Sequence, residues 1–149
     1  MLVIRSLHGA MVAALLVAGC ASDNPAGPGP ATSTLTGTWT GDVAESYGGR
    51  GRLRLTIEQT QFALSGTFQL EFEEAARSRS GHLTGNTEQP SLAPRMQLAS
   101  SGGFDCAPGL SRESFLQVTW TRTGDTLKGD YAGFGCVGPV TGSFDVRKD

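Results

Sequence analysis

Most of the sequence alternates between apolar and polar side chains over short stretches. In residues 51–59, Leu53, Leu55 and Ile57 alternate with Arg, Thr and Glu, so the apolar side chains share one face of an extended chain. The same period of two runs through residues 62–73. No stretch of similar length fits a helical period as well, and one dry face beside one wet face is typical of antiparallel sheets. The pattern therefore predicts an all-β domain.

We expect eight strands, joined mostly by short connections. Their predicted ranges are 35–45, 51–59, 62–73, 79–88, 95–100, 114–122, 126–133 and 139–147. Gly124 and Asp125 separate two of them, and this pair tolerates the positive φ angles of a tight hairpin turn. Sequential hairpins favour an eight-stranded antiparallel up-and-down meander that closes into a barrel. A β-sandwich with Greek-key crossings is the alternative.

A short motif recurs in five of the strands: apolar, polar, Gly, polar and then usually an aromatic residue. Alternation places each motif glycine on the inner face, between two larger side chains. These glycines are Gly37, Gly66, Gly85, Gly129 and Gly142. A glycine inside a strand permits sharp coiling and close approach of another backbone. We interpret the repeat as a means of curving the sheet; glycines that open a pocket are the alternative.

The inward positions are nearly all apolar, so we expect the barrel to be filled by its own side chains with almost no polar group inside. An eight-stranded barrel is just wide enough for such a filling or for one small ligand. The predicted interior residues are Trp39, Val43, Leu53, Leu55, Ile57, Phe62, Leu64, Phe68, Leu70, Phe72, Leu98, Leu116, Val118, Trp120, Leu127, Tyr131, Val140, Phe144 and Val146.

The first strand resembles that of a known group of barrels. Residues 35–42 (LTGTWTGD) look like the first strand of avidin-like and lipocalin-like proteins, and residues 64–68 and 118–120 are similar to later avidin strands. The resemblance implies the same eight-stranded barrel. It does not imply biotin binding, because Gly41 and Phe68 stand where that family has its ligand-binding Asn and Tyr.

The N-terminus has the pattern of an export signal. Arg5 precedes a short apolar run at 10–18, and small residues follow it. The run is shorter than the about 20 residues of a membrane-spanning helix. The sequence LVAGC at 16–20 resembles the lipobox of bacterial lipoproteins, which implies cleavage before Cys20 and acylation of that residue. A plain secretory signal with an incidental cysteine is the alternative.

These features predict three parts of the chain. We expect a lipoprotein signal peptide over 1–19, the lipidated Cys20 with a flexible tether rich in Pro and Gly over 20–34, and a β-barrel domain over 35–149. The tether has too little apolar surface to offset its ordering entropy. Ala21 follows the cysteine, and in lipoproteins the lack of Asp there indicates the outer membrane. We therefore expect a lipid anchor in the bacterial cell envelope, with the domain on the periplasmic or surface face.

Two further cysteines, Cys106 and Cys136, remain for a disulfide in an exported, oxidising compartment. In an up-and-down barrel both fall in loops at the same end. A bridge that closes about 30 residues stabilises by roughly 3–4 kcal/mol. Two unpaired thiols are the alternative.

The same end carries the longer Gly-rich loops, and loops at a barrel mouth are common binding sites. The candidate binding rim consists of Tyr47, Arg50, Phe104, Asp105 and Phe134. The alternative is that these side chains fold inward as plugs over the barrel mouth and the disulfide.

Charge and composition exclude several functions. The formal net charge is −2 and no basic block exists, which disfavours nucleic-acid binding. Two His and three Cys are too few for the usual zinc sites, and we predict no metal and no cofactor. Catalytic motifs are missing from the sequence, so we predict no catalytic residues. His82 is expected on the outer face, and Glu71 and Glu73 are expected in a solvated patch.

The sequence thus favours a non-catalytic binding protein. Our first hypothesis is a barrel, expected to be monomeric, that binds a small apolar ligand at its loop-rich open end. The second is a protein-interaction or inhibitor module with a filled barrel, acting on another envelope protein. A hydrolase is the third.

Overall fold

A computed structural model describes residues 34–89 and 93–149 of the chain. The predicted signal peptide over 1–19, Cys20 and the predicted tether up to residue 33 lie outside the described residues. The strands are β1 (Gly37–Glu45), β2 (Gly49–Thr60), β3 (Ala63–Phe72), β4 (Arg79–Asn86), β5 (Arg95–Ser100), β6 (Ser114–Thr123), β7 (Thr126–Gly135) and β8 (Gly138–Lys148); one short 3₁₀ helix, η1 (Ala75–Arg77), lies between β3 and β4.

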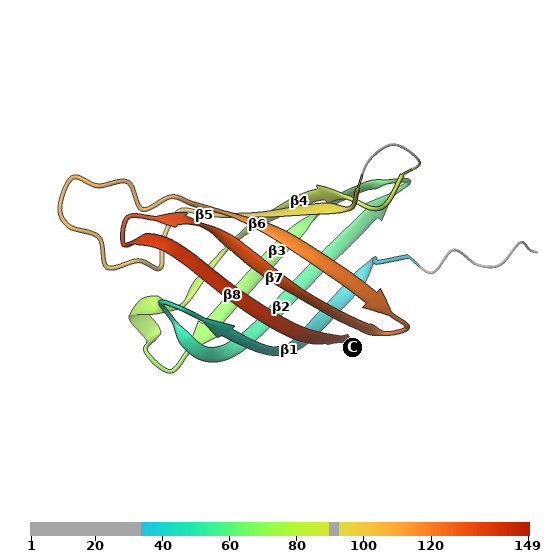
Figure 1. Cartoon of the computed structure of the whole chain (residues 1–149), viewed down its shortest axis with the longest axis horizontal. Helices are drawn as coiled ribbons and strands as arrows, with labels where there is room; N and C mark the ends of the chain where they lie inside the picture. Colours follow the sequence, from blue (N-terminus) through green and yellow to red (C-terminus); the bar gives the residue numbers. More distant parts are fainter. Residues whose placement is uncertain (1–33, 90–92) are drawn as a thin grey trace, which may run out of the picture. The chain divides into compact units, whose positions relative to one another are not determined.

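The eight strands form one closed antiparallel barrel in sequence order (Figure 1). Each strand pairs with the next, and β8 returns to pair with β1, with Val43 opposite Phe144. This confirms the predicted up-and-down meander and is incompatible with the sandwich. Every strand end lies within two residues of its predicted position, because alternation is strict wherever one face is dry and the other wet.

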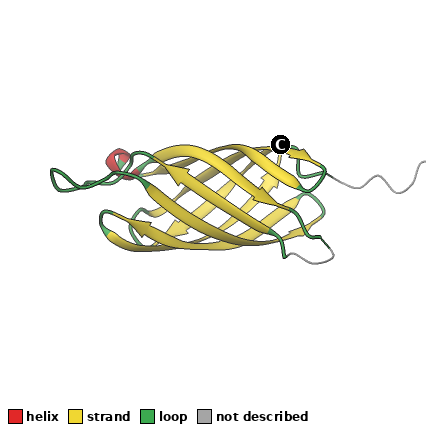
Figure 2. Ribbon diagram, turned by 90° about the horizontal axis from the view of Figure 1, so that it is seen from above, coloured by secondary structure: helices red, strands yellow, loops and turns green. Residues whose placement is uncertain are grey.

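The two ends of the barrel differ in their connections (Figures 1 and 2). The end that we call the loop end carries residues 46–48, 73–78, 101–113 and 136–137. At the opposite end, the tail end, β1 begins and β8 ends. The β7–β8 connection is shorter than expected: Gly135 pairs with Gly138, which leaves a two-residue turn. Gly138 has a φ of 101°, which a glycine adopts without strain.

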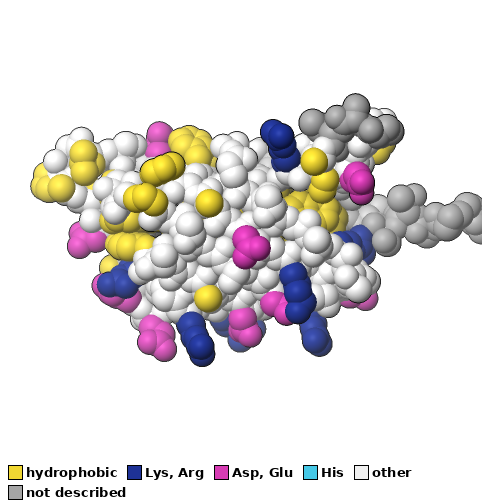
Figure 3. Space-filling model, viewed as in Figure 1, with side chains coloured by type: hydrophobic (Ala, Val, Ile, Leu, Met, Phe, Trp, Pro, Cys, Tyr) yellow, Lys and Arg dark blue, Asp and Glu magenta, His cyan; other side chains and the backbone are white. Residues whose placement is uncertain are grey.

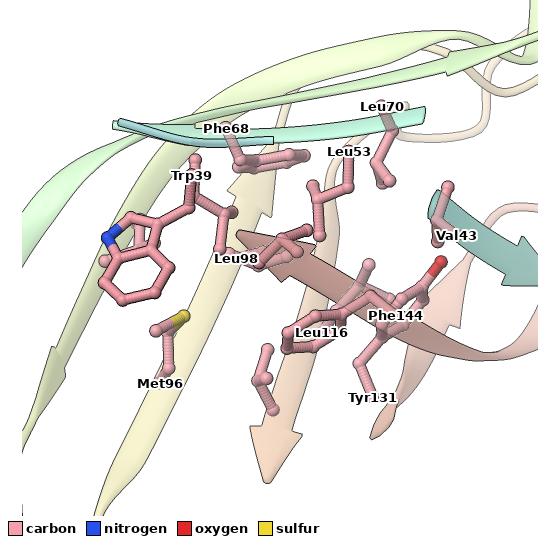
Figure 4. Close-up of a cluster of buried hydrophobic side chains, with 14 of the residues drawn as sticks. Trp39, Val43, Leu53, Phe68, Leu70, Met96, Leu98, Leu116, Tyr131 and Phe144 are labelled. Carbon is pink, nitrogen blue, oxygen red and sulfur yellow. The ribbon is translucent and has the colours of Figure 1, made fainter. Parts of the chain in front are cut away.

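Inward side chains fill the barrel (Figure 4). The predicted interior residues are buried except for two: Trp120 is partly buried against the core, and Phe62 is 49% exposed. Phe62 was wrongly predicted because it belongs to the β2–β3 turn, where Gln61 has a φ of 55° and interrupts the alternation. Leu35, Leu83 and Met96 also belong to the core, although the prediction omitted them.

The motif glycines do occupy inward positions, and three of them lie against the backbone of a neighbouring strand. A Cβ atom added at Gly66 would lie 1.9 Å from the carbonyl oxygen of Thr56, and Gly85 and Gly129 meet backbone oxygens in the same way. This close approach fits the curvature interpretation. At Gly142 the missing side chain instead leaves room for the ring of Tyr131.

Candidate functional site

A layer of polar side chains lies inside the barrel at the loop end. Its members, which we call the polar layer, are Glu45, Arg79, Ser100, Ser114 and Tyr131. This corrects the expectation of an interior almost without polar groups. Glu45 and Arg79 are in phase with the apolar residues of β1 and β4, so alternation pointed inward, but charged residues are rarely buried unless they are paired.

The centre of the polar layer is an ion pair between β1 and β4. The two terminal nitrogens of Arg79 donate to the two carboxylate oxygens of Glu45, one of them at 3.0 Å, and neither side chain is exposed. The hydroxyl of Tyr131 donates to Glu45 Oε2 at 2.6 Å, and the backbone N–H of Gly48 donates to Oε1 at 3.2 Å. Buried charges of this kind are tolerated only when they are paired and hydrogen-bonded.

The environment of Tyr131 keeps its hydroxyl protonated. Burial, followed by the nearby negative charge of Glu45, raises the pKa of Tyr131 above its ordinary value. Tyr131 therefore acts as a fixed donor to Glu45, not as an acid that could exchange a proton near neutral pH. Beside this triad, the hydroxyl oxygens of Ser100 and Ser114 lie 2.8 Å apart.

Two aromatic rings flank the Arg79 guanidinium. Its central carbon lies 4.6 Å from the ring centroid of Phe104 and 5.8 Å from that of Phe72, distances typical of cation–π contacts. The Nε atom of Arg79 is buried and has no hydrogen-bond partner. Phe104 comes from the 101–113 loop and is 4% exposed. It therefore closes the barrel directly above the polar layer.

The disulfide predicted from topology is confirmed. Cys106 is bonded to Cys136, with 5.6 Å between the Cα atoms and 30 residues between the two positions. The bond joins the 101–113 loop to the β7–β8 turn only two residues after Phe104. It thus fixes the loop at the point where the plugging side chain enters the barrel.

Three members of the predicted rim come together at the loop end. The ring of Tyr47 lies 5.4 Å from that of Phe104, and its hydroxyl accepts a hydrogen bond from the backbone N–H of Asp105 at 3.2 Å. Arg77 donates to the carbonyl oxygen of Tyr47 at 2.8 Å. Phe104 adopts the inward orientation of the plug alternative. The binding role of these residues stays a prediction.

Arg50 and Phe134, the other two rim candidates, point away from this cluster. Arg50 is on the outer face of β2 and lines a surface hollow with Asp42 and Asp145. Phe134 is 70% exposed on the outer face of β7, opposite Phe115 of β6, which is 53% exposed. Phe115 was not among the predicted candidates, although its position out of phase with Leu116 indicates an outward side chain.

The two phenylalanines belong to an uncharged part of the outer wall. Sheet register places one outward row across β4 to β8, namely His82, Ala99, Phe115, Phe134 and Pro139. The next row contains Thr84, Gln97, Gln117, Ala132 and Thr141. Neither row contains Asp, Glu, Lys or Arg. We call Ala99, Phe115, Phe134 and Pro139 the apolar patch; hydrophobic side chains gather at the loop end of this face (Figure 3).

Several hollows on the described part of the chain open on the outer wall. A shallow groove of about 740 Å³ crosses β1, β6, β7 and β8, with Ala44, Thr119, Ala132 and Ser143 among its outward residues. The hollow beside Arg50 has a volume of about 510 Å³. The barrel interior is instead occupied by side chains that are almost fully buried.

Residues 34–89 and 93–149 contain no group of three or more His, Cys, Asp and Glu side chains that could hold a metal ion. His82 is exposed, as are Glu71 and Glu73. Within the same described residues, no helix is long and apolar enough to cross a bilayer. The predicted lack of catalysis and of cofactors stays a prediction.

Known proteins offer little further guidance. No protein-family model matches the chain. The curated proteins likewise contain no significant match. The resemblance to avidin-like and lipocalin-like proteins is therefore supported only at the level of architecture, as an eight-stranded antiparallel closed barrel.

Proposed function

We propose that this protein is a lipid-anchored binding protein of the bacterial cell envelope, and that it holds another envelope protein on the outer wall of its barrel. The anchor rests on the lipobox-like sequence that ends at Cys20. The described chain enters the barrel at the tail end, where the carbonyl oxygen of Thr34 accepts hydrogen bonds from Arg122 and Lys148. The apolar patch lies at the other end of the barrel.

The observation that carries this proposal is the pair of exposed rings in the apolar patch. Phe115 and Phe134 are cross-strand neighbours, and both are more than half exposed. Clustered exposed apolar side chains on a soluble domain mark interaction sites more often than isolated ones do. Aromatic anchors surrounded by polar residues are typical of protein–protein interfaces.

Charge and packing favour a protein over the other binding partners. An anionic lipid surface attracts Lys and Arg, and the two outward rows at the patch contain neither. A small apolar ligand needs a cavity, whereas side chains fill the barrel. The partner that fits is therefore a protein that presents an uncharged, apolar surface.

A capture experiment with matched variants tests the proposal. The tagged mature protein is used to capture partners from its native envelope, alongside Phe115→Ser/Phe134→Ser and the control Phe62→Ser, which removes a similarly exposed ring outside the patch. We expect one protein to be retained by the wild type and by the control. After purification, this partner should bind the double variant at least about tenfold more weakly, because each buried ring contributes roughly 1.5–3 kcal/mol.

Two results would contradict the proposal. One is equal capture of the same proteins by the double variant. The other is co-purification of a small apolar molecule with no protein partner, which would favour the first hypothesis from the sequence. The anchor is tested separately by the mass of the mature N-terminus: Cys20→Ser should abolish both acylation and membrane association.

A further inference from the structure

Phe104 is unlike the rest of its loop. Residues 105–113 are exposed or half-buried, whereas the Phe104 ring is 4% exposed. Within the loop, backbone hydrogen bonds join Cys106 to Phe104 and Leu110 to Ala107. The loop therefore has little regular structure. It is held against the barrel mainly by the Phe104 ring and by the disulfide and hydrogen bond next to it.

The ring lies in a slot whose shape and charge suit an aromatic group. One wall is the Arg79 guanidinium, 4.6 Å from the ring centroid. Another is Gly135, where an added Cβ atom would come within 2.8 Å of the ring, so any larger residue would fill the slot. The tilted ring of Tyr47 lies 5.4 Å away. A flat, uncharged group with π-electrons over the cation is what these walls accommodate.

The Arg79 side chain that forms one wall of the slot also has a nitrogen without a hydrogen-bond partner. Arg79 Nε is buried without a hydrogen-bond partner, although the terminal nitrogens of the same side chain are paired with Glu45. A hydrocarbon ring has no lone pair and offers this N–H at most a weak contact with its π-electrons. Phe104 therefore makes a cation–π contact with the guanidinium but leaves the Nε–H without a hydrogen-bond acceptor.

Two attachments hold Phe104 in place. The Cys106–Cys136 bond fixes the chain two residues away, and the N–H of Asp105 donates to the Tyr47 hydroxyl. A covalent bond so close to the ring gives the side chain a high effective concentration at the slot. Without that bond, the ring has to compete with any external ligand from a long, flexible loop.

We propose that the Phe104 slot is a binding site for a flat, uncharged aromatic group, that the oxidised protein occupies it with its own side chain, and that a dithiol reductant opens it. In the opening step the dithiol supplies two electrons and two protons. The Cys106–Cys136 bond breaks, two thiols form, and the reductant becomes a cyclic disulfide. The site is separate from the apolar patch on the outer wall, so this inference does not depend on the proposed function.

The first experiment empties the slot directly. Phe104→Ala is compared with Phe62→Ala, which removes an exposed ring in the β2–β3 turn, and with the oxidised wild type. The probes are toluene, which matches the missing side chain, and methylcyclohexane, which has a similar size but no π-electrons. Binding is measured by ligand-observed NMR and by the shift in the thermal unfolding midpoint.

We expect toluene to bind Phe104→Ala at least about tenfold more tightly than it binds the oxidised wild type or Phe62→Ala. A cation–π wall should also favour toluene over methylcyclohexane by about threefold, whereas a plain apolar hole would favour the more hydrophobic saturated ring. Equal or reversed preference would overturn the assignment of an aromatic site.

The second experiment tests the disulfide without altering the slot. The wild type is measured with and without a dithiol, and Cys106→Ser/Cys136→Ser is measured without one. We expect the reduced wild type and the double variant to bind toluene at least about threefold more tightly than the oxidised protein, because the competing ring is no longer held in place. Identical toluene binding by the folded oxidised and reduced proteins would overturn the gating, even if Phe104→Ala failed to fold.

Discussion

The two ends of the barrel are closed by different chemistry. At the tail end, Trp39 is fully buried and its Nε1 donates to the carbonyl oxygen of Leu35 at 2.8 Å, a contact four residues away in sequence. Arg122 and Lys148 lie over the indole ring, 5.4 and 5.7 Å from it. The hydrogen bond of the indole is local, whereas its cations come from β6 and β8 and lie where solvent reaches them.

At the loop end, buried charges take the place of the neutral indole. Glu45, Arg79 and Tyr131 come from β1, β4 and β7, so their hydrogen bonds join strands that are distant in sequence and do not pair with one another in the sheet. A loop with a disulfide covers them. The tail end is thus stabilised mainly by packing, so that removing one contact costs little. The loop end is stabilised by a network, in which removing one member leaves another buried polar group without its partner.

The largest expected effect comes from removing one charge of the buried pair. Glu45→Gln keeps the side-chain shape but leaves Arg79 as an uncompensated buried cation, so we expect a loss of about 3–5 kcal/mol in the free energy of unfolding. Urea denaturation measures it. The control is Asp145→Asn, which removes the exposed partner of Lys128 and should change stability by less than about 1 kcal/mol. Similar small losses in both variants would remove the distinction between the two ends.

Loss of the disulfide should cause the second-largest decrease in the free energy of unfolding. Cys106→Ser/Cys136→Ser removes a cross-link that spans 30 residues, and we expect a loss of about 2–4 kcal/mol, mainly through greater freedom of the unfolded chain. The same denaturation measurement on the wild type with reductant provides the control and should give the same loss. Hydrogen exchange should accelerate at the loop end and remain unchanged around Trp39; uniform acceleration would contradict a local role.

Tyr131→Phe tests the third member of the network. It removes a hydrogen bond to a buried carboxylate, and we expect a loss of about 1.5–3 kcal/mol near neutral pH. The pKa of Tyr131 is raised in the folded protein, while an unfolded tyrosine ionises near pH 10. Above that pH the unfolded chain therefore binds fewer protons than the folded one, and stability falls as the pH rises.

This pH dependence gives the Tyr131 prediction its own control. Unfolding measured between pH 8 and 11 should show a decline for the wild type that is smaller in Tyr131→Phe, because the variant has no hydroxyl to ionise at that position. An equal decline in both proteins would assign the effect to other groups.

The smallest expected effect is at the tail end. Lys148→Met keeps the aliphatic stem over Trp39 but removes the charge of this half-buried lysine, and we expect the cation–π contact to contribute about 0.5–1 kcal/mol. The thermal unfolding midpoint, with the fluorescence of the two tryptophans as the signal, is the suitable measurement. A loss as large as that of Glu45→Gln would mean that the tail end also depends on a charge network.

Sequence alternation predicted the strands well because inward and outward positions alternate along each strand, and the inward side chains are nearly all apolar. Leu53, Leu55 and Ile57 could point nowhere else without exposing a row of apolar surface. The pairing of Cys106 with Cys136 was predicted from the two cysteines left for a disulfide, and the meander topology supported it, since loops alternate between the two ends of a meander. The prediction for Phe62 was wrong because Gln61, with its positive φ, interrupts the alternation at a turn.

The polar layer was missed for a different reason. Burial of Glu45 is favourable only if Arg79 and Tyr131 reach it from other strands, and one-dimensional alternation contains no information about such partners. The inward turn of Phe104 was equally inaccessible, because a loop has no period and the slot that receives the ring is built by Arg79 and Gly135 from elsewhere in the chain.

The pairing of β8 with β1 has a consequence for how the protein is made. The barrel closes through contacts such as Trp39 with Lys148, which join the two extremes of the domain. Until the final strand has been synthesised, β1 and β7 each present an open edge that can aggregate, and pairing across such a sequence separation is slow. A nascent chain truncated before residue 138 therefore cannot complete the cylinder, and we expect it to depend on chaperones where the full-length chain does not.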